Sequence, residues 1–324
     1  MRLPVRLIAA LAVVALCAPT IWLRSEVSRE RPKAIALAQV SGPQTTGVPG
    51  WSLEGVWQYS SAPTLRFGGF SGLLALSQGR LRAFSDRGLV FTFIEPDRAE
   101  EEPAKRLTAG LPLIDPALLP VLWDMESVTR DPETGDYWVG YEGTHAIHRF
   151  SYKTDPEAVR LLGDEVNWYD NGGLEAMERL SDGRFLIVPE GQSQALIFEG
   201  DPVEGGDATL IPYASPASGY AATDLAQLPD GRILVLMRRL AFDYPPFAGL
   251  LAIADPPAKG SNEPWAPQVI MRFDGLLPAE NYEGLAVRPI EDGRLAVWII
   301  SDDNIAALQR TLLAKMIFDP TVLK

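Results

Sequence analysis

The sequence predicts an all-β protein, and specifically a β-propeller for which five blades are favoured and six are the alternative. One hairpin motif recurs along the chain, and each copy has a glycine in its turn. These turn glycines are Gly79, Gly135, Gly183, Gly231 and Gly293, separated by 56, 48, 48 and 62 residues. A period near 50 residues that holds about four short strands and few helix signals is typical of a propeller blade. A stacked sandwich of hairpins is the competing architecture.

Further strands are expected between the hairpins. The third strands of the repeats are predicted at Val90–Ile94, Ala146–Tyr152, Ala195–Glu199, Leu250–Ala254 and Leu312–Phe318. The fourth strands are predicted at Arg106–Gly110, Val159–Leu162, Thr209–Tyr213 and Val269–Phe273. The last repeat lacks a fourth strand, and Leu53–Tyr59 from the start of the chain could supply it and close the ring. A sixth, degenerate blade could lie within 96–123 or 240–280.

The first 50 residues are expected to precede the folded domain. Arg2 and Arg6 begin a segment that is apolar from Leu7 to Leu23, so residues 1–24 are interpreted as a signal peptide or an N-terminal anchor. Residues 25–50 contain several Pro, Gly, Ser and Thr residues and are predicted to be a flexible linker. The propeller domain then covers 51–324. We expect a periplasmic or secreted protein, anchored in the inner membrane if the leader is not cleaved.

Charge and cysteine content narrow the function classes. The chain has a formal charge of −13, and without the three leader arginines 26 basic residues face 42 acidic ones, a charge of −16. Such a body is a poor partner for nucleic acid or for an anionic membrane surface. The one cysteine, Cys17, lies in the leader, so disulfides and thiol chemistry are not expected in the mature protein. We expect a monomer whose partner is a small molecule.

Carboxylates recur at matching positions of the hairpins. Glu175 and Glu190 are equally far from the Asp182-Gly183 turn, so they should face each other across two strands. The corresponding positions of the five repeats hold Ser71 and Asp86, Glu126 and Glu142, Glu175 and Glu190, Asp224 and Arg238, and Glu283 and Asp302. In a propeller these positions meet at one face. A ring of carboxylates there would repel itself unless cations were bound.

The composition of this ring favours a hard cation. Oxygen ligands without cysteine and with few histidines suit Ca²⁺, or less well Mg²⁺, better than zinc. The expected metal ligands are Asp86, Glu126, Glu142, Glu175, Glu190, Glu283 and Asp302. The alternative for each single acid is structural, because carboxylates at blade ends also accept hydrogen bonds from neighbouring backbone amides.

Several short motifs resemble those of a known family. They are Ser71-Gly-Leu73, Ser85-Asp-Arg-Gly88, Glu142-Gly143, Glu190-Gly191, Glu283-Gly-Leu-Ala286 and Ser301-Asp-Asp-Asn304. Their order is similar to that in the phytase-like family, described as "esterase-like activity of phytase", over roughly residues 50–320. The resemblance implies a propeller with acidic residues suspected of phosphoester chemistry. The chain departs from the pattern at Ser127 and at Met237.

The leading functional hypothesis is an exported, metal-dependent phosphoric-ester hydrolase. The metals would neutralise the phosphate and activate water, Arg238 would bind phosphate oxygens, and Asp224 or Asp303 would be the general base. A metal-dependent lactonase is one alternative, supported by Asn171, Asn281 and Asn304, which could join the acids around one cation. The other alternative is a non-catalytic periplasmic binding or scaffold propeller.

Overall fold

The computed structural model describes residues 35–61, 67–98, 106–108, 124–151, 158–163, 173–240 and 246–322, together with Ile8. Regular helix in these ranges is limited to two short 3-10 turns, η1 (Pro96–Arg98) and η2 (Pro202–Glu204). No helical segment within the described ranges has the length and hydrophobicity needed to span a bilayer. Apart from Ile8, the predicted leader at 1–24 lies outside the described residues.

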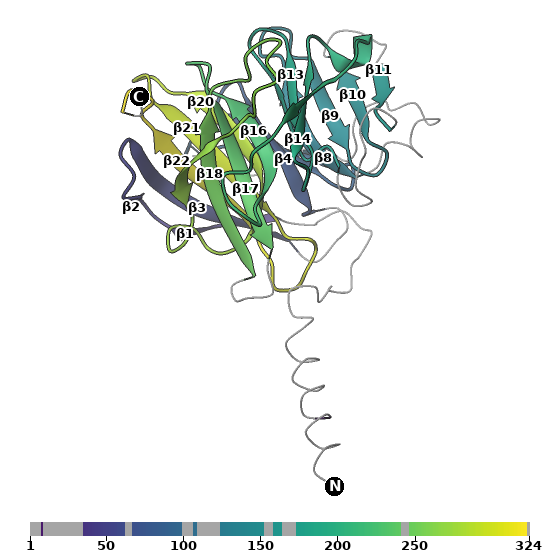
Figure 1. Cartoon of the computed structure of the whole chain (residues 1–324). Helices are drawn as coiled ribbons and strands as arrows, with labels where there is room; N and C mark the ends of the chain where they lie inside the picture. The colour runs from purple at the N-terminus through teal and green to yellow at the C-terminus, as the bar shows by residue number, and fades with distance from the viewer. Residues whose placement is uncertain are drawn as a thin grey trace.

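The strands form five antiparallel sheets, which are the blades of a propeller (Figure 1). The first blade consists of β4 (Phe70–Leu76), β5 (Arg80–Ser85), β6 (Val90–Ile94) and β7 (Arg106–Thr108). The second consists of β8 (Met125–Arg130), β9 (Tyr137–Tyr141), β10 (Ala146–Phe150) and β11 (Ala158–Leu161). The third consists of β12 (Ala176–Arg179), β13 (Phe185–Val188), β14 (Gln194–Phe198) and β15 (Thr209–Pro212). The fourth consists of β16 (Ala221–Gln227), β17 (Ile233–Leu240), β18 (Phe247–Ala254) and β19 (Gln268–Arg272).

The fifth blade joins the two ends of the domain. Its inner strands are β20 (Asn281–Pro289), β21 (Leu295–Asp302) and β22 (Thr311–Phe318), and its next strand is β3 (Trp51–Ser61) from the start of the domain. The pairing of β22 with β3 is antiparallel, with Leu313 opposite Trp57. The prediction that Leu53–Tyr59 closes the ring is therefore confirmed. This closure leaves neither terminal strand with a free inner edge.

Part of the segment predicted as a linker is strand. β1 (Ile35–Ser41) pairs with the outer edge of β3, and β2 (Gln44–Thr45) pairs with the same strand nearer its start. Ile35 and Leu37 are half-buried and pack against the core between the fifth and first blades. Alternating side chains of β1 thus contribute to the fold, and the Pro, Gly and Ser residues around this strand hid that alternation in the sequence.

The inner strands form a closed ring, which fixes the blade count. β4 contacts β8, β8 contacts β12, β12 contacts β16, β16 contacts β20, and β20 returns to β4. Five blades are therefore present, and in the described part of 240–280 the strands β18 and β19 belong to the fourth blade, so no sixth blade is found there.

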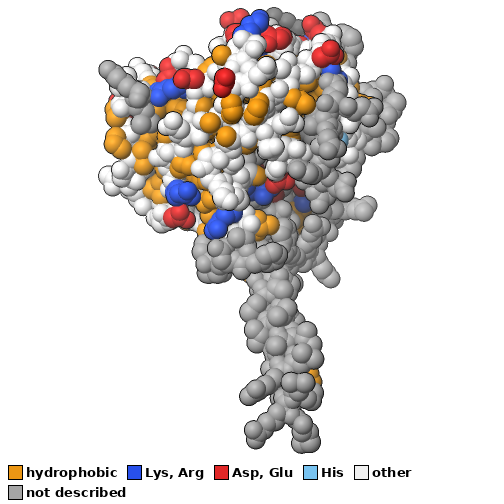
Figure 2. Space-filling model, viewed as in Figure 1, with side chains coloured by type: hydrophobic (Ala, Val, Ile, Leu, Met, Phe, Trp, Pro, Cys, Tyr) orange, Lys and Arg blue, Asp and Glu red, His pale blue; other side chains and the backbone are white. Residues whose placement is uncertain are grey.

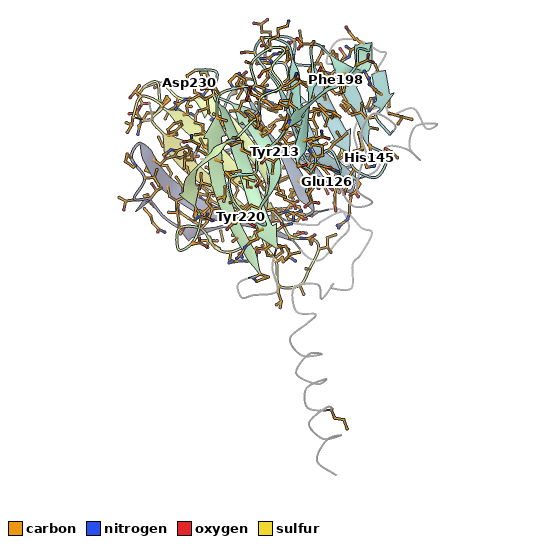
Figure 3. The ribbon with its side chains drawn as sticks, viewed as in Figure 1. Glu126, His145, Phe198, Tyr213, Tyr220 and Asp230 are labelled. Carbon is orange, nitrogen blue, oxygen red and sulfur yellow. The ribbon has the colours of Figure 1, made fainter. Side chains whose placement is uncertain are left out.

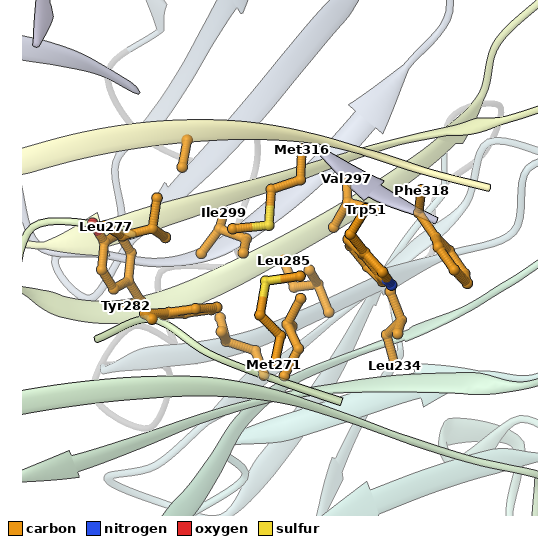
Figure 4. Close-up of a cluster of buried hydrophobic side chains, with 14 of the residues drawn as sticks. Trp51, Leu234, Met271, Leu277, Tyr282, Leu285, Val297, Ile299, Met316 and Phe318 are labelled. Carbon is orange, nitrogen blue, oxygen red and sulfur yellow. The ribbon is translucent and has the colours of Figure 1, made fainter. Parts of the chain in front are cut away.

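Five hydrophobic clusters make up the core, one at each interface between neighbouring blades. Figure 4 shows the cluster between the fourth and fifth blades, where Leu234 and Met271 face Tyr282 and Ile299. In the fifth blade Trp51 stacks on Phe318 with 4.3 Å between ring centroids. Because apolar side chains fix each sheet against both neighbours, the ends of the inner strands are held at two opposite mouths of the ring.

Candidate metal centre

A β-bulge lies near the start of the inner strand in four blades. The register shifts by one residue there, and the extra residues are Ser71, Glu126, Thr223 and Glu283. In the third blade Glu175 takes the same place, directly before β12. A bulge re-aims the side chain of its extra residue. These side chains therefore gather at one mouth, named here the carboxylate mouth. In Figure 3 Glu126 marks this end, and Asp230 marks the opposite end, where the turns lie.

The second strand of each hairpin ends at the same mouth. Within two residues of the end of each second strand lie Asp86, Glu142, Glu190, Arg238 and Asp302. Backbone hydrogen bonds fix their places: the amide of Asp86 donates to Gly69 O at 2.8 Å, and that of Glu142 donates to Asp124 O at 2.9 Å. Four carboxylates and one guanidinium are thus held at equivalent positions around the ring.

Two carboxylate triads form on the second and third blades. Carboxylate oxygens of Asp124, Glu126 and Glu142 lie within 4.8 Å of one another, and so do those of Glu142, Glu175 and Glu190. Glu142 belongs to both triads. Oxygens at such separations can reach a common Ca²⁺, whose ligands lie 2.3–2.6 Å from the ion. The structure thus brings four of the seven predicted ligands into two metal-sized groups.

The sequence pattern did not mark Asp124 as a candidate ligand. Its backbone has φ of 71°, in the left-handed region that non-glycine residues rarely adopt. Gly69 and Gly173 hold the equivalent position in the first and third blades, where their amide partners are Asp86 and Glu190. An acid two residues before Glu126, at a place that other repeats give to glycine, was the available signal.

One of these glycines is required by close packing. A Cβ on Gly173 would overlap the side chain of Glu142 from the preceding blade, and it would lie 2.8 Å from the Cα of that residue. The absence of a side chain at 173 therefore lets Glu142 reach its place between the two triads.

Arg238 links three blades. Its Nη2 lies 3.3 Å from Glu190 Oε1 in the third blade, and its Nε lies 3.1 Å from Glu283 Oε1 in the fifth. Burial alone would lower the pKa of Arg238, but the carboxylates of Glu283 and Glu175 raise it above its ordinary value. The guanidinium thus remains charged among carboxylates that are themselves half-buried or buried.

Burial and mutual repulsion raise the pKa of most acids at this mouth. Burial is the largest cause for Glu126 and Glu175, and nearby carboxylates add to it, so the pKa of both lies well above the ordinary value. Burial, Asp124 and Glu190 raise the pKa of Glu142 to about 7. The pKa of Asp86 rises to about 6 through burial, although Arg87 opposes this. Burial and mutual repulsion make it unfavourable for all these carboxylates to be ionised at once. A bound cation would stabilise their ionised forms.

Three predicted ligands lie at the same mouth but outside the triads. They are Asp86, Glu283 and Asp302, on the first and fifth blades. Glu283 accepts a hydrogen bond from Asn281 Nδ2 at 2.7 Å and another from Ser71, while burial raises its pKa. The pKa of Asp302 is raised by burial and then by Glu283 and Asp86. Asn281 is 3% exposed, and its Oδ1 has no hydrogen-bond donor within the described part of the chain.

The two predicted bases have structural contacts instead. Asp224 is displaced by one residue from the bulge, which Thr223 occupies. Its oxygens accept hydrogen bonds from the amides of Leu225 at 2.8 Å and Leu285 at 2.6 Å, which ties the fourth blade to the fifth. Asp303 accepts from Gly69 N at 3.2 Å, from Ile305 N at 3.0 Å and from Thr311 Oγ1 at 2.9 Å. The structure does not bring Asp224 into the cluster, and the acceptor capacity of Asp303 is largely used.

The donor set fits a hard cation. The two triads offer only carboxylate oxygens, with neither cysteine nor histidine among them. This is the chemistry that Ca²⁺ and Mg²⁺ prefer, and a site with several protein carboxylates suits Ca²⁺ better, because Mg²⁺ usually keeps several of its water ligands. Asn171, one of the three asparagines considered for a lactonase site, lies outside the described residues.

Fold and site together define a five-bladed β-propeller with a carboxylate-rich mouth. The chain belongs to the phytase-like family, since the family model described as "Esterase-like activity of phytase" matches residues 65–305. The family membership expected from the sequence is thus confirmed, and it supports a phytase-like hydrolase at the level of the family.

Solved structures resemble the chain only distantly. An exo-1,5-alpha-L-arabinanase from a bovine ruminal metagenomic library has 13% identity and a TM-score of 0.46, with 78% of this chain and 95% of that chain covered. YCF48 from Cyanidioschyzon merolae has 12% identity and a TM-score of 0.42, covering 84% and 77%. The WD40 β-propeller domain of Doa1 has 12% identity and a TM-score of 0.40, covering 85% and 100%. A comparison with curated proteins finds no match. None of these likenesses bears on activity.

Proposed function

We propose that the protein is a metal-dependent phosphoric-ester hydrolase, with Ca²⁺ as the favoured metal and Mg²⁺ as the less suitable one. The observation that carries the proposal is the pair of carboxylate triads that share Glu142 beside Arg238. Membership of the phytase-like family supports the same reaction class.

The residues that would hold the cation are Asp124, Glu126, Glu142, Glu175 and Glu190. A bound divalent cation would supply positive charge for the phosphate oxygens and activate water. Asp86, Glu283 and Asp302 lie at the same mouth and would complete its negative lining. The protein itself contributes fixed oxygens and excludes bulk water from Glu175, which is 4% exposed.

Arg238 is the proposed phosphate-binding residue. A guanidinium has five N–H donors, and Glu190 and Glu283 engage only two of its nitrogens. Donors therefore remain for phosphate oxygens, which arginine binds in a bidentate manner. Its side chain is 18% exposed, so a substrate can reach it from the mouth.

Asp86 is the proposed general base. Its pKa of about 6 leaves it ionised at neutral pH yet more basic than an ordinary aspartate. Its side chain is 24% exposed, and Arg87 Nη2 lies 3.6 Å from its Oδ2. Asp224 and Asp303 are less suitable for this role, because backbone amides and a hydroxyl occupy their oxygens.

A lactonase is the second candidate, and Asn281 is the observation that favours it. Asn281 pairs with Asp302 across the hairpin, and its amide touches Glu283. One glutamate, one asparagine and one aspartate could therefore share a cation at the fifth blade.

The test is hydrolysis of 4-nitrophenyl phosphate and of a sugar lactone by the purified protein, with calcium and with a chelator. We expect phosphate-ester cleavage that the chelator abolishes. Glu175→Ala should lower the rate of this cleavage at least a hundredfold. Glu199→Ala, at an exposed glutamate of the same blade, is the control. Lactone cleavage alone would support the second candidate. Melting that responds to calcium without any hydrolysis would support a binding or scaffold propeller. If a chelator changes neither melting nor hydrolysis, the metal proposal is wrong.

Export remains part of the proposal. Its support is the basic and apolar pattern of residues 1–24. The measurement is the amino-terminal sequence and the cell fraction of the protein produced from the full chain. A protein recovered with an intact leader in the cytoplasm would contradict export.

A further inference from the structure

The opposite mouth of the ring contains a cavity. It has a volume of about 400 Å³, and all five inner strands or the turns that follow them contribute to its wall. This end, named here the turn mouth, is the end at which Asp230 lies in Figure 3. Along the corresponding upper edge of Figure 2, acidic and basic side chains are mixed. The volume is that of a small-molecule site.

Most charged groups in the cavity wall are already engaged. Glu178 accepts one hydrogen bond from Gln227 N and another from Thr129 Oγ1, each at 2.8 Å, so both its oxygens are used. Arg179 Nη2 pairs with Asp131 Oδ2 at 3.2 Å. Glu133, at the rim, is exposed to water. These groups already have hydrogen-bond, ion-pair or water partners, so they do not require a ligand.

Arg130 differs from them. It belongs to the cavity wall and is half-buried, yet within the described residues its guanidinium has neither an ion pair nor a hydrogen bond. Burial lowers its pKa, and the like charge of Arg82 in the first blade lowers it further. Asp131 and Glu178 oppose this lowering of the pKa, although their oxygens already engage Arg179, Thr129 and the amide of Gln227. A partly desolvated cation beside another cation is stabilised by an anion.

Most of the other lining residues are apolar, but polar atoms contribute more of the exposed cavity surface than apolar atoms do. Leu74, Val128, Leu225 and Leu285 come from four different blades, and all four are buried. A ligand that fills this space would therefore meet polar and apolar surface as well as the charge of Arg130.

We propose that the turn mouth binds a small organic anion, whose carboxylate or phosphate group pairs with Arg130 and whose body lies among the other residues that line the cavity. The site is distinct from the candidate metal centre. Glu126 and Arg130 lie at opposite ends of β8, and four residues of strand span about 13 Å.

Titration of the protein with 4-fluorobenzoate, followed by fluorine NMR, tests the proposal. We expect saturable binding that Arg130→Gln weakens at least tenfold, because a charge-assisted hydrogen bond is lost. Arg80→Gln removes the same charge from the same region, but Arg80 lies outside the cavity wall, so binding should be unchanged. Inorganic phosphate should compete if the anionic group alone suffices.

Methyl chemical shifts of the unaltered protein give a second measurement that does not depend on a variant folding. On addition of 4-fluorobenzoate, the methyl signals of Leu74, Val128 and Leu285 should move. Shifts that instead cluster around Arg238, binding that does not saturate, or an Arg130→Gln protein of unchanged affinity would each overturn the proposal. Glu175→Gln should leave this binding intact, and Arg130→Gln should leave any hydrolysis intact, so the failure of one site is distinguishable from the failure of the other.

Discussion

The third and fourth blades place different chemistry on the same backbone. Both hairpins present an incoming and an outgoing side chain at the carboxylate mouth. The third blade fills these places with Glu175 and Glu190, whereas the fourth fills them with Thr223 and Arg238. The repeats therefore share the backbone geometry of these two positions, and the residue type at each position decides the local charge.

This difference separates negative and positive charge around the carboxylate mouth. Carboxylate triads lie on the second and third blades, and the guanidinium of the fourth blade reaches the nearest acids on both sides of it. This arrangement would attract a cation to one side and an anionic group to Arg238. A symmetric ring of acids would have only the first property, so the proposed phosphate-ester activity depends on the exchange at the fourth blade.

Loss of Arg238 is expected to have the largest effect on stability. Arg238→Ala leaves Glu283, which is buried, without its cation, and breaking such a pair costs about 3–5 kcal/mol. We expect a fall of this order in the free energy of unfolding of calcium-free protein at pH 8, measured by urea denaturation. Arg232→Ala breaks an ion pair with Asp230 near the surface and should cost less than about 1 kcal/mol. Equal losses in the two variants would show that Arg238 is an ordinary surface residue.

Glu175→Gln should separate repulsion from metal binding. It removes one negative charge from the triad with Glu142 and Glu190, so the calcium-free protein should melt at a higher temperature than the unaltered protein. Calcium at about a hundred times its dissociation constant should stabilise the unaltered protein by about 2.7 kcal/mol and the variant far less. Differential scanning calorimetry measures both effects. A variant that melts lower without calcium and keeps the full calcium shift would contradict the metal centre.

Asp224→Asn should lower the stability of the protein and leave its calcium response unchanged, the opposite of what we expect for Glu175→Gln. An amide offers one acceptor oxygen where the carboxylate accepts from both Leu225 N and Leu285 N, so a buried donor loses its partner at a cost of about 1–3 kcal/mol. The melting temperature should fall with and without calcium by the same amount. A changed calcium response would return Asp224 to the metal centre.

The periodicity of the sequence was sufficient to predict the propeller fold. Turn glycines and short apolar runs predicted the blades, the third and fourth strands and the closure by β3, because each repeat must bury both faces of its sheet against neighbours. β1 was missed, since a single short strand at an outer edge has no repeat to reveal it. Its alternating Ile35 and Leu37 were the only local sign.

The site was predictable only to within one residue. Counting outward from the turn assumes an unbroken ladder, and this worked where an acid occupied the bulge, as at Glu126 and Glu283. In the fourth blade the same count selected Asp224, but the bulge residue is Thr223. A shift of one residue sends a side chain to the other face of the strand. Asp124 was missed because the count followed pairs and ignored the residue that precedes the bulge.

The pH dependence of stability should also distinguish the carboxylate mouth from the turn mouth. The raised pKa of Glu142, about 7 against an ordinary 4.5, means that the folded calcium-free protein holds protons that the unfolded chain has lost. The free energy of unfolding should therefore fall as pH rises from about 4.5 to 7. Calcium needs ionised ligands, so its stabilising effect should grow over the same range. Urea denaturation at several pH values, with and without calcium, measures both slopes.

Glu178 is the control for this pH effect. Its pKa is also raised to about 7, mainly by burial, but it lies in the wall of the turn mouth. Glu178→Gln should reduce the pH slope of the calcium-free protein and leave the calcium effect unchanged. A calcium effect that is independent of pH would argue against ligands of raised pKa.

The smallest expected effects concern the two hydroxyl residues at the bulge. Ser71 donates to Glu283 and thereby favours its ionised form, whereas Thr223 Oγ1 donates to the backbone oxygen of Tyr282 at 3.2 Å. Each alanine variant should lose about 1 kcal/mol of stability. The loss in Ser71→Ala should be larger at pH 8 than at pH 5, because its partner is a titrating carboxylate, and the loss in Thr223→Ala should be equal at both. Urea denaturation at the two pH values decides, and a pH-independent Ser71→Ala would show that Ser71 does not act on the charge of Glu283.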